Sequence, residues 1–443
     1  MGTLTGRRWR LVCLSLSLLT IVSVATRDAG AADAIPGEQW CERTVDAIRF
    51  TGNKVTREQV IRRELFQQEG VACSLDAIID GIQNLLDLGL FKSVQAQLEL
   101  NGDELTLYYH VVEKIFFLPI PRFSRTSDGE LRLGAQLRWD NFQGRLHQVK
   151  LTSEKRQEND GQGRAGYIHS IDYTVPRFFG SRYGMRLRST FERRNAQLAQ
   201  DGIVYGETLR QSRRGGFRLA RWASDTSGIS GLSYFAGFGI ELRSYDMRSG
   251  TAGPFSDGQD IALVGGFDVT RVHQDPYRRR GHQYGATLIL ADTSLGSDFS
   301  YARADVQARW YLPLARALTN LNVQARLGVS DRAPFGERSY RIGGGELLRG
   351  MESDAHTGNI LTLLNVEYLA GFFAYPAWRW LVFADMGNVY LGNDVNLLEQ
   401  HLRGGIGLRW KLEALTNTDL RLDLAWDPDK GDVKPYVSTS LTF

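Results

Sequence analysis

The sequence has little net charge and no long apolar segment beyond its first residues. Lys and Arg total 53 against 50 Asp and Glu, a formal charge of +3 over 443 residues. This balance gives no reason to expect nucleic acid as a partner. Beyond residue 34, no stretch approaches the roughly 20 consecutive apolar residues of a membrane helix. That part of the chain is therefore either soluble outside the cytoplasm or a membrane β-barrel.

The sequence also lacks the motifs of metal-dependent and nucleophilic enzymes. The 7 His are dispersed and form no metal-binding pair, and no G-x-S-x-G motif occurs. Asp268, His273 and Asp275 are close in sequence, but at a strand end such residues are more often turn or lumen residues. We therefore expect a protein that is not an enzyme and that binds neither a metal ion nor a cofactor.

Glycine and aromatic residues are abundant instead. The chain has 47 Gly, together with 21 Phe, 17 Tyr and 9 Trp. Many strands with tight turns and interfacial rings have this composition, whereas helices do not. The composition therefore favours a mainly β fold.

Residues 1–34 have the pattern of a signal peptide. Arg7, Arg8 and Arg10 precede an uncharged apolar run at 11–24 that is too short to span a bilayer comfortably. Cleavage is expected after Ala34, with a second possible site after Ala25. The pattern predicts export from the cytoplasm.

Residues 41–114 are expected to form a small α+β domain with the order β-α-α-β-β. Thr56 and Gln59 have the spacing of a capping box, which predicts a helix from there to about Gln67. Apolar residues at helical spacing, with Ser74 as a cap and Gly89 at the end, predict a second helix. The expected strands are 45–50, 93–100 and 105–113, the last two joined by an Asn-Gly turn.

Cys41 and Cys73 are the two cysteines beyond residue 34. A strand of about six residues climbs roughly 20 Å and a helix of about 12 residues returns roughly 18 Å, which brings both cysteines to the same end of the domain. A disulfide is expected in an oxidising compartment. Two unpaired buried thiols are the alternative.

Apolar and polar residues alternate repeatedly across residues 116–443. A soluble sandwich shows the same alternation, but its strands are shorter and its polar face carries fewer arginines. About fifteen segments suit a membrane barrel, and because single-chain bacterial barrels have an even number of strands, we assign 116–124 as the sixteenth. The predicted fold is a transmembrane antiparallel β-barrel of about 16 strands behind the small domain, with a long loop at 331–358.

Several motifs resemble one known family. The order of elements in 41–114, with segment 88–94 closing the second helix, resembles a POTRA (polypeptide-transport-associated) domain. Within the long loop, the run from Gly343 and Gly344 to Arg349 and Gly350 resembles the loop signature of the bacterial surface antigen superfamily, with Met351 in place of the usual aromatic residue. Segments 140–144 and 383–385, and the aromatic end at 443, resemble further motifs of these outer-membrane assembly and translocation proteins.

The resemblance implies a non-enzymatic translocase or insertase in the bacterial outer membrane, with its first domain in the periplasm. It would take up unfolded client polypeptides and assemble them into the membrane or move them across it. The implied partners are outer-membrane or secreted client proteins, outer-membrane lipids and periplasmic accessory proteins. A dedicated secretion channel or a passive pore is the alternative, because it shares the same motifs.

Two sites are predicted within the barrel. A guanidinium in the lumen needs carboxylates, so we expect Arg349 to fold inward and bond Asp385, with Glu367 nearby. At the seam, Pro119 and Pro121 lack the N–H groups that a ladder requires.

If the segment with these prolines faces 435–443, which ends at Phe443, the closing pair is weak enough to open. The alternative is that the prolines belong to a linker and that the barrel begins at Leu131.

Overall fold

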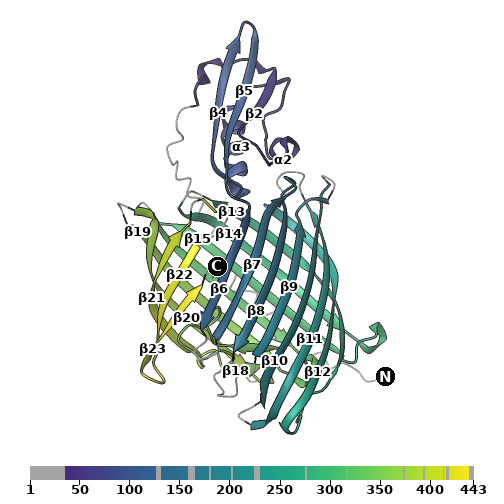
Figure 1. The fold of residues 1–443 in the computed structure, drawn as a ribbon. Coiled ribbons are helices and arrows are strands. Elements are labelled where there is room, and N and C mark those ends of the chain that lie inside the picture. Colours follow the sequence, from purple (N-terminus) through teal and green to yellow (C-terminus); the bar gives the residue numbers. More distant parts are fainter. Residues whose placement is uncertain are drawn as a thin grey trace.

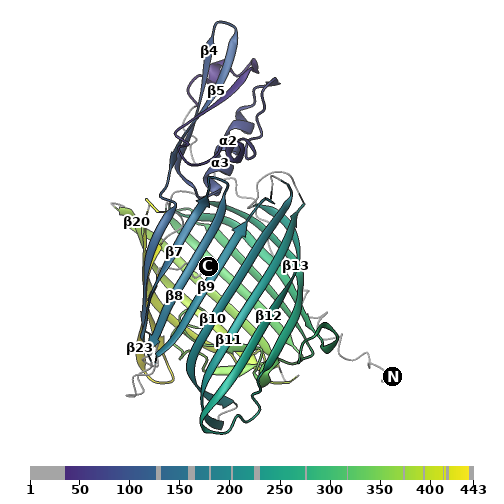
Figure 2. The same ribbon diagram turned by 45° about the vertical axis from the view of Figure 1, so that its right-hand side comes forward.

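A computed structural model describes residues 35–125, 131–157, 165–178, 181–200, 203–223, 230–274, 277–316, 318–372, 375–392, 395–412, 414–415 and 419–438. The predicted signal peptide and Phe443 lie outside these ranges. A small domain stands at one end of a barrel of tilted strands (Figures 1 and 2). We call this the proximal end and the opposite end the distal end. None of the described helices is long and apolar enough to cross a membrane.

The small domain packs two helices against a three-stranded sheet. The sheet has β5 (Glu104–Glu113) at its centre, with β2 (Ala47–Thr51) parallel to it on one side and β4 (Phe91–Asn101) antiparallel on the other. Apolar residues from all these elements, including Ile48, Ile61, Ile78 and Leu107, form one buried core. The elements are η2 (Glu38–Trp40), β1 (Thr44–Val45), β2 (Ala47–Thr51), α2 (Glu58–Arg62), β3 (Val71–Ala72), α3 (Leu75–Asp87), β4 (Phe91–Asn101) and β5 (Glu104–Glu113).

The second helix follows its sequence signals and the first does not. The Ser74 side chain caps α3 by accepting from the N–H of Ala77 at 3.3 Å, and Gly89 follows it with φ 71°. The capping box at Thr56 is wrong, because α2 is only five residues long and Arg57 is its N-cap. Thr56 is instead bound to the barrel, where its hydroxyl accepts from the Asn141 amide at 2.8 Å.

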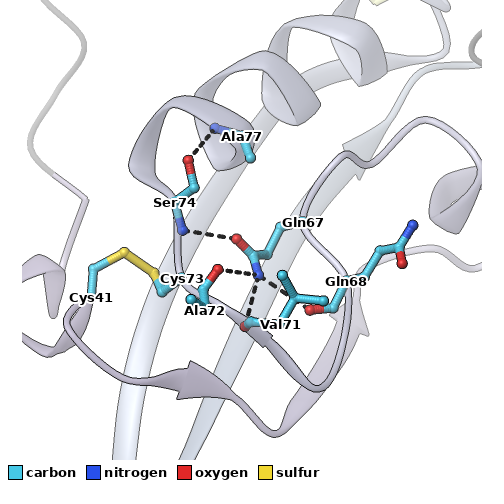
Figure 3. The surroundings of a disulfide bond; sticks show 8 residues. All are labelled: Cys41, Gln67, Gln68, Val71, Ala72, Cys73, Ser74 and Ala77. Carbon is cyan, nitrogen blue, oxygen red and sulfur yellow. Dashed lines mark hydrogen bonds between the residues drawn. A yellow bond between two sulfur atoms is a disulfide. The ribbon is translucent and has the colours of Figure 1, made fainter.

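Cys41 and Cys73 form a disulfide, with their Cα atoms 5.0 Å apart (Figure 3). The short pair β1 and β3 brings them together, because the N–H of Cys73 donates to the Arg43 carbonyl at 2.9 Å. The buried Gln67 amide, at the end of the predicted helix, holds this segment by donating to Ala72 and accepting from Ser74. The cysteines therefore meet through a strand pair rather than through a returning helix.

Replacing both cysteines with Ala is expected to destabilise the small domain by about 3–4 kcal/mol, because the disulfide closes a long loop. Limited proteolysis of the full-length protein should then cleave residues 41–73 faster, while the barrel stays intact. The single Cys41→Ala variant should behave like the double variant. Equal cleavage rates with and without the disulfide would show that it adds no stability.

Within the described residues, the barrel is one antiparallel sheet of 16 strands, so the predicted fold class is confirmed. Side chains alternate between an apolar outer face and a charged lumen, as on β22, where exposed Leu422 and Leu424 flank buried Asp423. The strands, in order, are β6 (Phe117–Arg125), β7 (Leu131–Phe142), β8 (His147–Gln157), β9 (Ala165–Val175), β10 (Tyr183–Gln200), β11 (Ile203–Trp222), β12 (Gly231–Gly250), β13 (Gly258–Gln274), β14 (Arg279–Ala291), β15 (Tyr301–Pro313), β16 (Thr319–Ser330), β19 (Ile360–Phe372), β20 (Tyr375–Tyr390), β21 (His401–Lys411), β22 (Asp419–Asp427) and β23 (Asp432–Ser438).

The three longest of these strands far exceed the roughly 10 residues that a membrane strand needs. β10, β11 and β12 have 18, 20 and 20 residues and extend at the distal end (Figure 2). Polar pairs such as Gln197 opposite Glu207 continue the ladder there. A strand needs an apolar row only where it faces lipid. The alternation of apolar and polar residues therefore ends at the membrane surface, although the strand continues beyond it.

The long loop between β16 and β19 carries little regular structure. It contains the short 3₁₀ helix η5 (Pro334–Gly336) and a short hairpin of β17 (Tyr340–Ile342) and β18 (His356–Gly358). Another 3₁₀ helix, η4 (Thr293–Leu295), lies in the neighbouring distal loop. The long loop returns into the barrel, where it meets two separate parts of the wall.

Candidate functional site

Arg349 projects from the long loop into the lumen and is 1% exposed. Its Nε and Nη2 donate to both carboxylate oxygens of Asp385 on β20, at 2.6 and 2.7 Å. Its Nη1 donates to Glu367 on β19 at 2.6 Å. The structure thus brings together the three residues that the sequence predicted for this site.

A third carboxylate and two further arginines complete the cluster. Nη1 of Arg349 also donates to Asp423 on β22 at 3.2 Å. Arg409 on β21 and Arg421 on β22 each donate to the same Asp423, at 2.5 Å. Three arginines therefore face three carboxylates, which balances the charge of a buried group.

Asp423 was not among the residues predicted for this site, although it lies on the polar row of its strand. The alternation along β22, whose odd-numbered residues point into the lumen, was the one feature of the sequence that could have indicated it. The pairing depends on how strands β19 to β22 are staggered around the barrel, and a single sequence does not specify that stagger. Asn365 was missed for the same reason: its amide donates to Asp385 at 2.9 Å and to the Leu347 carbonyl at 2.8 Å.

An aromatic ring stacks on Arg349 even though the loop has Met351 at the usual aromatic position. The guanidinium carbon lies 3.5 Å from the ring centroid of Phe383, which shares the inward row of Asp385 on β20. Met351 is buried in a separate apolar cluster with Ile342 and Leu348. The wall therefore supplies the cation–π contact that the loop does not.

The glycines of the loop signature allow a close approach to the wall. Gly350 has φ 88°, its N–H donates to the Tyr436 hydroxyl at 3.0 Å, and a Cβ there would lie 2.6 Å from the Trp426 carbonyl. Gly343 has φ 119°, and a Cβ there would lie 1.9 Å from a backbone oxygen. Gly344 has φ 81°. These positions require glycine for both conformation and space.

A second anchor, which the sequence did not reveal, holds the start of the loop. Phe335 is fully buried against Tyr245 and Phe255, with the Arg243 guanidinium 4.2 Å from its ring centroid. The neighbouring Glu337 carboxylate lies 2.8 Å from Arg243 on β12. Strands β10 to β12 are about half a barrel away from β20 in the strand order. The loop therefore connects opposite walls.

Burial alone would raise the pKa of Glu337, but Arg243, Arg341 and Arg210 hold it down at about 2. A carboxylate whose pKa is lower in the folded state stabilises that state above its ordinary pKa near 4.5, and the contribution disappears as pH falls toward 2. We expect hydrogen-exchange protection of residues 334–341 to be constant between pH 5 and 8 and to fall below about pH 4.

The Glu337→Gln variant provides the control for this expectation. It should show reduced protection at every pH, with no added loss below pH 4, because it has no carboxylate to protonate. A Glu337→Gln protein with the wild-type pH profile would show that another group controls the second anchor.

The predicted seam lies between the two edges of the sheet. β6 forms one edge and β23 the other, and the two strands approach each other. The Asp140 N–H donates to the Phe116 carbonyl at 2.8 Å, so even-numbered residues of this strand bond to β7 and odd-numbered residues face β23. Pro119 and Pro121 occupy odd positions and remove two donors from the seam.

No ladder joins β6 to β23 in the described part of the chain, which ends at Ser438. Pro121 lies within β6 and pairs with Ala135, so the prolines belong to a barrel strand and not to a linker that ends before Leu131. Phe443 lies outside the described residues.

The small domain is bound across the proximal mouth (Figure 1). The Asp87 carboxylate, at the end of α3, accepts from the Gln274 N–H at 2.7 Å and lies 2.8 Å from His273 of β13. On the other side, the Arg57 N–H donates to the Gly144 carbonyl at 3.0 Å. His273 thus binds the small domain rather than Asp268, whose carboxylate contacts Arg218.

Asp275 lies outside the described residues. No group of three or more His, Cys, Asp or Glu side chains within the described ranges has a metal-binding arrangement.

Two family descriptions match the chain. The surface antigen variable number repeat, POTRA, matches residues 43–114, and the Omp85 superfamily domain matches residues 141–443. The chain is 23% identical over 402 residues to the outer membrane protein assembly factor BamA of Neisseria meningitidis serogroup B. This alignment covers 82% of the chain and 48% of the relative, so the chain spans about half of that protein's length.

Solved structures share the fold at low sequence identity. BamA from Haemophilus ducreyi lacking POTRA domains 1–3 has a TM-score of 0.54 at 18% identity, covering 92% of this chain and 84% of that chain. CdiB from Acinetobacter baumannii has 0.62 at 14%, covering 90% and 74%. CdiB from Escherichia coli has 0.65 at 12%, covering 90% and 76%.

The resemblance found in the sequence is confirmed by these matches. The POTRA match coincides with the small domain at the proximal mouth, and the Omp85 match covers most of the barrel. The proximal end is therefore the periplasmic end and the distal end is extracellular. The chain belongs to the Omp85 superfamily of outer-membrane β-barrel proteins.

Proposed function

We propose that this protein inserts unfolded client polypeptides into the outer membrane without catalysing a chemical reaction. The main support for the proposal is the seam between β6 and β23. Two prolines of β6 face β23 there, and no ladder joins these two strands in the described residues. Opening the barrel wall exposes backbone groups to lipid, which is costly wherever a full ladder must break. The seam is the place where that cost is smallest.

The POTRA domain supplies an edge at which a client can bind first. β4 is the outer strand of its sheet and is 11 residues long. On its outer edge the N–H of Leu98 donates to the Pro36 carbonyl at 2.8 Å, and the other groups of this row are unpaired within the sheet. An extended client segment adds to such an edge through main-chain hydrogen bonds, largely independently of its sequence. The same mode suits the many different sequences of unfolded membrane proteins and permits periplasmic accessory proteins to bind there.

The long loop keeps the wall beside the seam in place. Asp385 and Asp423 belong to β20 and β22, and β22 is the neighbour of the edge strand β23. Arg349 joins both strands, and the hydroxyl of Tyr436 on β23 accepts from the N–H of Gly350. The anchored loop therefore holds β20, β22 and β23 together, so that opening separates β23 from β6.

Site-specific crosslinking tests this function. A photo-crosslinking residue at Val437, which is on the outer face of β23 and 47% exposed, should capture a client during its assembly. The matched control is Leu263 on β13, which is 49% exposed on the opposite part of the wall. Capture at both positions or at neither would count against insertion at the seam.

A secretion channel is the second candidate, because α3 covers a cavity at the periplasmic mouth. The cavity is lined by residues of both parts, among them Leu88, Leu90, Gln274 and Tyr311. A client that passes through the lumen must first separate Asp87 from β13. Large conductance without client crosslinks at Val437 would favour this function.

A further inference from the structure

The outer faces of β20 and β21 follow from the alternation of their side chains. Asp385 contacts Arg349 in the lumen, so odd-numbered residues of β20 point inward and even-numbered residues point outward. Val382 lies on the outward row and is 48% exposed. Ile406 and Leu402 of β21 pair with outward residues of β20 and are 58% and 61% exposed. These rows are part of the lipid-facing surface.

The loop between β20 and β21 folds back onto this outward row. The hydroxyl of Tyr390 donates to the Asn396 carbonyl at 2.9 Å, and the Asn388 amide donates to the Glu399 carbonyl at 2.5 Å. Both side chains stand at even positions, and Tyr390 is only 6% exposed. Residues 396–399 therefore lie against the outside of the barrel rim and cover its polar groups.

These four residues form a tight turn with two leucines at its tip. The N–H of Glu399 donates to the Asn396 carbonyl at 3.0 Å, which places Leu397 and Leu398 at the central positions. They are 66% and 94% exposed. Central turn positions usually carry Gly, Pro, Asn, Asp or Ser. Two leucines there contribute little to the fold of the chain itself.

The turn is also held in one shape. The Asn396 side chain accepts from the N–H of Leu398 at 3.1 Å and donates to the carboxylate of Glu399 at 2.8 Å. The carboxylate is thus hydrogen-bonded within the turn. The leucines project from a fixed support, and ordering them requires little additional loss of conformational freedom.

The depth of the turn matches the edge of the bilayer. Trp410 stacks on Trp378 at the periplasmic end of β20 and β21, as expected for an aromatic girdle. From Trp410 to Leu402, β21 rises about 26 Å along the strand, or about 20 Å along the barrel axis after its tilt. The apolar band of such barrels is about 25 Å tall. The turn ends three residues before Leu402 and therefore lies at the extracellular edge of this band.

We propose that the turn 396–399 is a lipid anchor whose Leu397 and Leu398 insert among the acyl chains of the outer leaflet. The turn prolongs the lipid-facing row of Ile406 and Leu402, from which Leu398 is separated by Gln400. The anchor fixes the extracellular end of β21, which is the third strand from the seam edge. It holds this part of the wall in the membrane while the edge strand moves.

Spin labelling of the full-length protein in phosphatidylcholine vesicles tests the anchor. A nitroxide at Leu398→Cys should be reached by oxygen, which concentrates in lipid, several-fold better than by a water-soluble nickel chelate. Ile406→Cys is the lipid-facing reference. Lys430→Cys, in the neighbouring β22–β23 hairpin and 54% exposed, is the aqueous reference. Labelling without reductant leaves the Cys41–Cys73 disulfide unmodified.

The expected result is an accessibility ratio for position 398 close to that of position 406. A ratio like that of position 430 would overturn the proposal. Dipolar broadening between labels at position 398 would also overturn it, because it would show a second copy of the chain on the turn. The outcome is independent of client insertion, so the proposed function and the anchor can fail separately.

Discussion

Replacing Arg349 with Ala is expected to detach the tip of the long loop from the barrel wall. The substitution leaves Glu367, Asp385 and Asp423 facing only Arg409 and Arg421, and removing one partner from a buried ionic cluster costs about 3–5 kcal/mol. Protease added outside intact cells should then cut residues 343–352, which the wild-type fold protects. Assembly of client proteins should fall in parallel.

Two variants define the cause of this effect. Arg332→Ala removes an exposed arginine from the same loop and should leave protection unchanged. Adding Asp385→Asn to Arg349→Ala removes the carboxylate that loses its arginine partner and should restore part of the protection. An Arg349→Ala protein with a fully protected loop would contradict the role of the ionic cluster.

Restoring the missing donors at the seam is expected to slow client assembly. Pro119→Val and Pro121→Val together introduce two N–H groups at positions that face β23. A backbone hydrogen bond contributes about 1 kcal/mol, so two of them reduce the open population by on the order of 30-fold. The rate of client insertion into liposomes should fall by at least about tenfold if opening limits it.

Pro376→Val is the matched control for the proline variants. Pro376 lies at the start of β20, away from the seam, so its replacement should leave the rate unchanged. If the double seam variant kept the wild-type rate while its heat stability increased, opening would not limit insertion.

The architecture could be predicted from the sequence because the membrane imposes a simple rule. Each membrane strand needs one apolar and one polar row, and this alternation identified the strands and the inward position of Asp385. The rule no longer applies outside the lipid, so the extensions of β10 to β12 were missed. The ionic cluster at Arg349 was predicted only in part, because contacts between strands depend on their stagger.

Local patterns failed where a distant contact decides the structure. Thr56 has the spacing of a helix cap, but a bond to Asn141 of the barrel holds it instead. Phe335 is one aromatic residue in an irregular loop, and no periodicity reveals that it is fully buried against another wall. Arg243 and Glu337 form an ion pair there, but they are far apart in the sequence, and no local pattern predicts their contact.

The most direct test of the account is a reversible crosslink across the seam. Cysteine pairs that join β6 to Val437→Cys on β23 should block client insertion into liposomes when oxidised and permit it again after reduction. A crosslink between Leu422→Cys and Val437→Cys, which lie opposite each other in β22 and β23, should permit insertion in both states. Unchanged insertion with a fully oxidised seam would contradict lateral opening.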